Sequence, residues 1–124
     1  MRLLCVDDDG AFLMLYREFF SAQCGIEVTT ALGYGQAVSC LQQQTFDAVI
    51  TDLCLGHDLP DGRDLVTWLV EHERSEFIIV VAGRSTVRDE WPEGAKMVRI
   101  VMKPFSLLEL WSTLKDLVPN PSLS

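Results

Sequence analysis

Five short apolar runs alternate along the chain with longer segments in which apolar residues recur every three or four positions. The β-branched content of the runs predicts strands at residues 3–6, 26–31, 48–52, 77–81 and 97–102. The helical spacing predicts amphipathic helices at residues 10–24, 35–43, 64–73 and 107–117. Strands that alternate with helices across short loops favour an α/β fold with a doubly wound, five-stranded parallel sheet.

Local residues set the limits of the first helix. Asp9 is expected to cap its start and Gly25 to end it. Within this helix one apolar stripe has helical spacing and is expected to face the core: Phe12, Leu15 and Phe19.

Two further signals mark the C-terminal half of the chain. Ser106 and Glu109 form a capping box that predicts the start of the last helix. Pro92 interrupts residues 83–95, so the fourth helix of an alternating fold is expected to be irregular or shortened.

Composition narrows the class of protein. A chain of 124 residues fits a single domain over residues 1–124, with residues 118–124 as a short tail. The net charge of −8 argues against nucleic acid as a direct partner. No apolar run approaches the length of a membrane span, and the first strand begins too early to leave room for a signal peptide. We therefore expect a cytoplasmic protein without a membrane partner.

Charged residues follow three of the predicted strands. Asp7 and Asp8 follow the first strand, Asp52 ends the third, and Lys103 follows the fifth. Parallel strands bring their carboxyl ends to one edge of the sheet, where such folds place their ligands. Carboxylates gathered at one edge repel each other unless one protonates or a cation joins them. Carboxylates together with water and phosphate are ligands that suit Mg²⁺, which is the expected cofactor.

These residues resemble the receiver domain of two-component response regulators. The resemblance rests on Val6-Asp7-Asp8, on Asp52 and on Lys103-Pro104-Phe105, in that order along nearly the whole chain. It implies a flavodoxin-like (βα)5 fold with strand order 2-1-3-4-5. It also implies two-component signal transduction, in which a carboxylate accepts a phosphoryl group.

The resemblance assigns a role to each matching position. Asp52 would be the phosphoacceptor, and Lys103, aimed inward by a cis Lys103–Pro104 bond, would contact the phosphate. Asp8 and Asp52 would bind Mg²⁺ directly and Asp7 through water, with the backbone carbonyl of Cys54 as a further ligand.

The resemblance also implies partners. A sensor histidine kinase or a histidine phosphotransfer protein would supply the phosphoryl group. A downstream protein, or a second copy of the chain in a homodimer, would receive the output. Such a protein is not an enzyme, apart from catalysing its own phosphorylation and dephosphorylation.

Two positions depart from the receiver pattern. Ala82 stands at the end of the fourth strand, where receivers usually carry the hydroxyl of Ser or Thr. Ile100 stands three residues before the lysine, where Tyr or Phe is usual. Gly83 keeps the small residue that leaves room for phosphate. We therefore expect intact phosphoacceptor chemistry with an atypical conformational switch.

Two other functions compete with this interpretation. The first is a receiver-like interaction module that is never phosphorylated, which the two departures favour. The second is a haloacid-dehalogenase-like phosphatase, because Asp7-Asp8-Asp9-Gly10 also fits the start of that family, with Asp7 as nucleophile and Asp9 as acid/base. Binding of Mg²⁺ tests the first alternative, and turnover of a phosphomonoester tests the second.

Overall fold

A computed structural model describes residues 1–23, 25–55, 60–83 and 98–118 of the chain. It contains one sheet in the order β2-β1-β3-β4-β5, in which each neighbouring pair is parallel. The strands are β1 (Arg2–Val6), β2 (Glu27–Ala31), β3 (Ala48–Asp52), β4 (Phe77–Ala82) and β5 (Val98–Met102). The predicted fold class and strand order are confirmed. The prediction of an irregular fourth helix lies outside the described residues.

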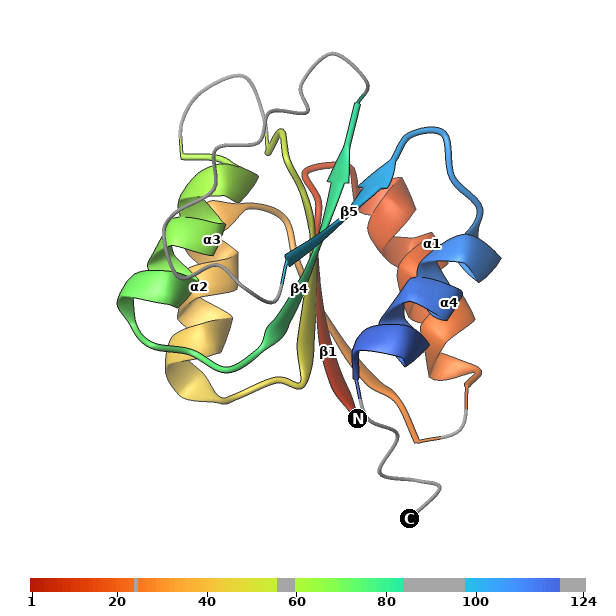
Figure 1. Cartoon of the computed structure of the whole chain (residues 1–124), viewed down its shortest axis with the longest axis horizontal. Helices are drawn as coiled ribbons and strands as arrows, with labels where there is room; N and C mark the ends of the chain where they lie inside the picture. The colour runs from red at the N-terminus through yellow and green to blue at the C-terminus, as the bar shows by residue number, and fades with distance from the viewer. Residues whose placement is uncertain (24, 56–59, 84–97, 119–124) are drawn as a thin grey trace.

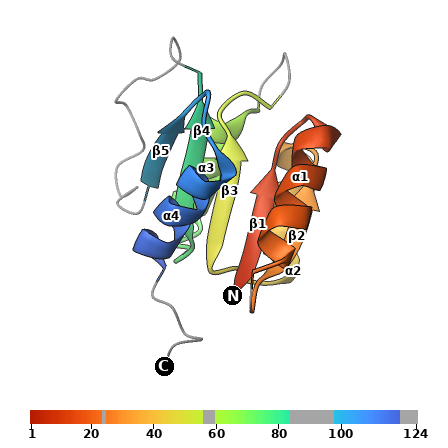
Figure 2. The ribbon, with the colours of Figure 1, turned by 90° about the vertical axis from the view of Figure 1, so that its right-hand side faces the viewer.

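Within the described residues, four helices cover the two faces of this sheet. They are α1 (Gly10–Ser21), α2 (Tyr34–Gln43), α3 (Gly62–Glu71) and α4 (Leu107–Leu117). Helices α2 and α3 lie on one face and α1 and α4 on the other (Figure 1). The view turned by 90° shows α1 and α4 side by side in front of the strands (Figure 2). No helix within the described ranges is long and apolar enough to cross a membrane.

The core has two layers because alternate strand residues point to opposite faces. Leu4 and Val6 of β1 pack in the layer with α2 and α3, whereas Leu3 and Cys5 pack in the layer with α1 and α4. Every residue of β3 is buried. Burial on both faces explains why the central strands appear in the sequence as continuous apolar runs rather than as alternating ones.

The predicted inward stripe of α1 was wrong for Phe12 and Leu15, whereas Phe19 is partly buried against the core, as expected. The buried residues of this helix are Leu13, Tyr16 and Phe20, whereas Phe12 is 39% and Leu15 50% exposed. Both sets have helical spacing, so the sequence pattern alone does not decide between them. The choice follows from the sheet, which the Leu13 set contacts in one core layer with β1 and β3.

The predicted end of α1 at Gly25 was also wrong. Asp9 caps the start as expected, since its side chain accepts a hydrogen bond from the Ala11 N–H. The helix ends at Ser21, with Ala22 as its C-cap. Gly25 has a φ of 80°, a conformation that glycine adopts without steric cost, and it serves the turn into β2 instead.

Helix α3 starts two residues before the predicted position. Asp61 is its N-cap and forms a reciprocal capping box with Asp64, which had been expected as the first helical residue. Helix α4 starts as predicted, because the Ser106 side chain accepts a hydrogen bond from the Glu109 N–H at 3.1 Å. Both caps satisfy backbone donors that have no partner within the helix.

Candidate functional site

Three carboxylates meet at the carboxyl edge of the sheet, as expected from the sequence. Asp7 follows β1 and Asp52 ends β3, and both side chains are buried, whereas Asp8 is exposed. Each offers an oxygen that lies within 4.8 Å of the oxygens offered by the other two. The cluster therefore has one solvent-accessible member and two members held inside the protein.

Backbone hydrogen bonds fix the position of Asp7. Its N–H donates to the Ala31 carbonyl of β2 at 3.1 Å. Its Oδ1 accepts a hydrogen bond from the Asp9 N–H at 2.9 Å. Asp9 in turn caps α1 through its own side chain, so the segment that carries the acids is tied to the start of the helix.

The pKa of Asp7 shows that a negative charge is unfavourable at this buried position among other acids. The pKa of Asp7 rises from its usual 3.8 to about 6, mainly because the group is buried and also because of the charge of Asp52. The Asp9 N–H and the Lys103 ammonium act in the opposite direction. A cation among these oxygens would relieve the repulsion, so the three side chains fit a hard divalent ion.

Lys103 reaches the same site from the loop after β5. Its Nζ donates to Asp52 Oδ2 at 2.9 Å, and the Lys103–Pro104 bond is cis, as predicted. Partial burial alone would lower the pKa of Lys103, but the hydrogen bond and charge of Asp52 raise it above its usual value. The ammonium therefore stays charged beside the Asp52 carboxylate.

The second oxygen of Asp52 has a backbone partner. Asp52 Oδ1 accepts a hydrogen bond from the Cys54 N–H at 3.2 Å. The chain between them is anchored to β4, because the Leu53 N–H donates to the Val81 carbonyl at 2.9 Å. The Cys54 side chain is exposed, and its main chain runs close to the carboxylate.

Comparison with known families agrees with this arrangement. The family model described as "Response regulator receiver domain" matches residues 3–115. The chain belongs to this family. It is a receiver domain of the kind used in two-component signalling.

Two curated relatives share sequence with this receiver. The alginate biosynthesis transcriptional regulatory protein AlgB of Pseudomonas putida is 33% identical over 86 residues, which are 69% of this chain and 18% of that protein. The sensor protein GacS of Pseudomonas syringae pv. syringae is 32% identical over 91 residues, or 72% of this chain and 10% of that protein. The chain thus spans less than a fifth of the length of these relatives.

Solved receiver structures have the same fold. The response regulator TrrA of Thermotoga maritima in complex with Mg²⁺–BeF is 25% identical, with a TM-score of 0.79 over 94% of this chain and 98% of that one. A response regulator receiver domain protein from Clostridium thermocellum is 18% identical, with a TM-score of 0.80 over 98% of this chain and 97% of that one.

Two positions of this receiver lack the side chains expected for a switch. Ala82 ends β4 and is buried, and its carbonyl accepts a hydrogen bond from the Lys103 N–H at 2.9 Å. Ile100 lies half-buried in β5 beside Val80. Gly83 follows directly after β4, as expected.

Sequence reasoning missed one feature beside the site. A hollow of about 440 Å³ opens next to Lys103 and is lined also by Phe12, Pro104 and Phe105. Phe12 had been assigned to the core, and its exposure on the outer side of α1 is what forms one wall. The exposed Leu15 and Leu108, on α1 and α4, add apolar surface on the same two helices.

Proposed function

We propose that this receiver accepts a phosphoryl group on Asp52 in an Mg²⁺-dependent reaction, with a histidine kinase or a histidine phosphotransfer protein as the donor. One observation carries the proposal: the oxygens of Asp7, Asp8 and Asp52 gather within 4.8 Å, and the Lys103 ammonium contacts Asp52 at 2.9 Å. An acidic nucleophile, a cation site and a fixed positive charge are the parts that phosphoryl transfer requires.

In the reaction, a carboxylate oxygen of Asp52 attacks the phosphorus of a phosphohistidine. The P–N bond breaks, its electron pair stays on the imidazole nitrogen of the donor, and an acyl phosphate forms on Asp52. Attack of an anion on an anionic phosphate is electrostatically unfavourable. The Lys103 ammonium offsets this repulsion because it is already positioned beside the nucleophile and needs no rearrangement.

The acid cluster would hold the Mg²⁺ ion. When bound, Mg²⁺ supplies a divalent charge to the oxygens of the phosphoryl group and of the protein. In our proposal Asp8 and Asp52 bind it directly, Asp7 through water, and the Cys54 carbonyl completes the protein ligands. The raised pKa of Asp7 supports this assignment, since a cation would compensate the charge that burial penalises.

Partner proteins would dock at the carboxyl edge of the sheet, where Asp52 lies. The hollow lined by Phe12, Pro104 and Phe105 lies beside Lys103, and apolar contacts there would hold a donor protein whose phosphohistidine reaches Asp52. The output would be contact with a downstream protein, or with a second copy of the chain. With Ala82 and Ile100 at the switch positions, the conformational response would depend on Lys103 and backbone groups.

A second candidate function is a receiver module that signals without being phosphorylated. Ala82 and Ile100 favour it, because neither side chain can perform the usual switch. The phosphatase alternative has less support. Asp9 would have to act as its acid/base, yet the Asp9 side chain caps α1.

The deciding experiment is the intact mass of the protein after incubation with Mg²⁺ and acetyl phosphate, beside an Asp52→Asn variant. We expect a gain of one phosphoryl group in the native protein alone. An equal gain in both proteins would move the acceptor to another residue, with Asp7 the first to be tested. No gain in either, together with normal Mg²⁺ binding, would favour the unphosphorylated module.

A further inference from the structure

Helix α3 begins directly against the end of the strand that carries Asp52. Its first residue, Gly62, is buried. The Gly62 N–H donates to the Leu53 carbonyl at 2.9 Å. The start of α3 is therefore bound to the residue that immediately follows Asp52.

Gly62 leaves no space for a side chain. A Cβ atom added there would overlap the Asp52 carbonyl oxygen and lie 2.9 Å from Leu53 Cα and 3.1 Å from the Asp52 carbonyl carbon. All three are backbone atoms, so no side-chain rotation can relieve the overlap. By contrast, a Cβ added to Gly10, Gly33 or Gly35 meets nothing within 4 Å.

The requirement for glycine at this position is one of space and not of backbone torsion. Among the described glycines only Gly25 has a positive φ, so the Gly62 backbone is one that other residues adopt. A side chain at residue 62 would cost little in an isolated helix, where alanine is preferred to glycine. The cost arises only because α3 and the end of β3 approach so closely.

We propose that Gly62 is a positioning residue for the Asp52 carboxylate. The helix cannot easily retreat, because the Asp61–Asp64 capping box fixes its start and Leu65, Val66 and Leu69 are buried in the core. A side chain at residue 62 therefore pushes the Asp52–Leu53 peptide away. This displacement moves the carboxylate relative to Lys103 Nζ and to the acid cluster.

The inference rests on the proposed function, since it concerns the geometry of the same acceptor. Misplacing a reacting group by about 1 Å can lower a rate by about 100-fold. Asp52 is also the member of the acid cluster that lies next to Gly62, so binding of Mg²⁺ should weaken along with the transfer reaction. Both effects should arise from the Cβ atom alone, whichever residue replaces Gly62.

The test compares Gly62→Ala and Gly62→Ser with Gly35→Ala, a glycine substitution in α2 that meets no neighbour. The rate of phosphorylation by acetyl phosphate and the Kd for Mg²⁺ are measured well below the melting temperature of each variant. We expect both Gly62 variants to react at least about 10-fold more slowly and to bind Mg²⁺ several-fold more weakly. Gly35→Ala should match the native protein in both measurements.

Further variants separate positioning from loss of stability and from failure of the proposed function. Val66→Ala removes a buried side chain one turn further along α3 than Gly62. If it slows the reaction as much as Gly62→Ala does, general destabilisation explains the result and the inference is wrong. If no protein is phosphorylated, the proposed function fails, and a crystal structure of Gly62→Ala still decides. Lys103 Nζ remaining about 2.9 Å from Asp52 Oδ2 in that variant would overturn the inference.

Discussion

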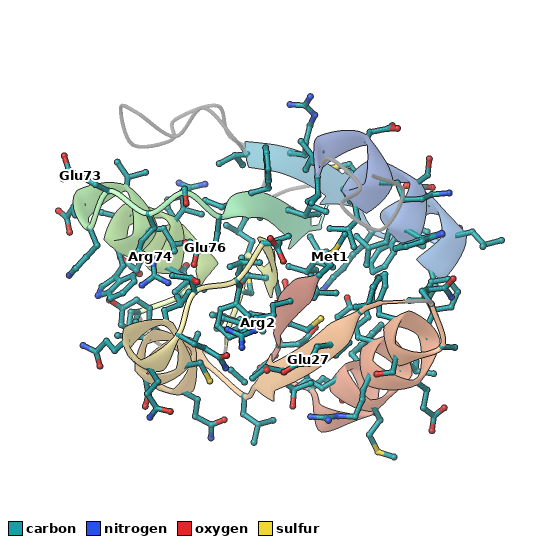
Figure 3. All side chains as sticks on the ribbon, turned by 90° about the horizontal axis from the view of Figure 1, so that it is seen from below. Met1, Arg2, Glu27, Glu73, Arg74 and Glu76 are labelled. Atoms are coloured by element: carbon teal, nitrogen blue, oxygen red, sulfur yellow. The ribbon has the colours of Figure 1, made fainter. Side chains whose placement is uncertain are left out.

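The two ends of the sheet each carry a buried carboxylate paired with a basic side chain, and the two pairs differ in every other respect. At the carboxyl end, Lys103 Nζ lies 2.9 Å from Asp52, with side-chain exposures of 40% and 9%. At the amino end, Arg74 Nη2 lies 2.6 Å from Glu76, with side-chain exposures of 16% and 1%. Figure 3 shows Arg74 and Glu76 together at the amino end of the strands.

Most hydrogen-bonding groups of the pair at the amino end have a partner in the protein. The Arg74 guanidinium donates to both oxygens of Glu76 and to the Leu41 and Gln44 carbonyls at the end of α2. Glu76 Oε2 also accepts a hydrogen bond from the Phe46 N–H at 3.0 Å. This network holds together the segments that precede β3 and β4, and its charges are met largely by partners within the protein.

The pair at the carboxyl end is more accessible to solvent, and its surroundings do not fully compensate its charges. Lys103 is partly exposed, and beside Asp52 the pKa of Asp7 is raised mainly by burial and also by the charge of Asp52. The two pairs show that ion pairing at a buried carboxylate does not by itself indicate function. The difference lies in whether the surrounding groups satisfy the charges or leave room for a cation and a phosphate.

Breaking the pair at the amino end should have the largest effect on stability. Arg74→Ala leaves the Glu76 carboxylate buried without its partner, and removing one member of a buried pair costs about 3 kcal/mol. Urea unfolding measures the loss. The control is Arg17→Ala, which removes an exposed arginine with one hydrogen bond to Thr30 and should cost less than about 1 kcal/mol.

The same variant tests whether the two ends are independent. Phosphorylation of Arg74→Ala by acetyl phosphate, measured where the protein is fully folded, should proceed at the native rate. A rate reduced as far as that of a Lys103 variant would show that the division between a structural end and a functional end is wrong.

Removing the Lys103 ammonium should lower the phosphorylation rate and leave stability nearly unchanged. Lys103→Met should lower the phosphorylation rate by about 100-fold, because one preorganised positive charge is lost from the transition state. The free energy of unfolding should change by less than about 1 kcal/mol, since the amine is partly exposed to water. Lys115→Met, at an exposed lysine of α4, is the matched control and should keep the native rate. A loss of stability like that of Arg74→Ala would contradict this comparison.

The sequence predicts the functional end of the molecule better than the structural end. The positions of Asp7, Asp8, Asp52 and Lys103 follow from strand ends, because each lies at the end of an apolar run or within two residues after it. Parallel topology then brings them together without further information. The charge cluster could be expected on these grounds, whereas the strand order and the cis Lys103–Pro104 bond were implied by the resemblance to receiver domains.

The buried pair at the amino end could not be found in this way. Arg74 and Glu76 lie in a polar segment between α3 and β4 that has the composition of an exposed loop. Their other partners are backbone groups about 30 positions away in the chain, at Leu41, Gln44 and Phe46. Backbone groups are the same at every position, so the residue types at these three positions do not reveal that their backbone binds Arg74 and Glu76.

The inward face of α1 shows a second limit. The Phe12 set and the Leu13 set both recur at helical spacing, so the helix is apolar over more than one face. Only the position of the sheet decides which set is buried. Phe12, the first member of the wrongly assigned set, lines the hollow beside Lys103, so the incorrect prediction fell on a residue that bears on our proposal for partner binding.

The smallest expected effect is on the free energy of unfolding, which the buried charge of Asp7 lowers. The pKa of Asp7 is raised to about 6, so the folded protein retains a proton between about pH 4 and pH 6 that the unfolded chain has released. Stability therefore falls as the pH rises through this window, and the full penalty is present above pH 6. Asp7→Asn should remove the penalty, raising the free energy of unfolding of the metal-free protein at pH 7.5 by about 1 kcal/mol after allowance for solvent screening.

The pH dependence identifies the origin of this gain. At pH 4.5 the folded native protein carries a neutral Asp7, so Asp7→Asn should change stability by less than about 0.5 kcal/mol. Urea unfolding at both pH values, in the presence of a chelator, makes the comparison, with Asp8→Asn at the exposed acid as the control. A gain of equal size at both pH values would show that Asp7→Asn acts through packing. A gain confined to pH 7.5 would show that the carboxyl edge is held below its maximal stability by the charges that we propose bind Mg²⁺.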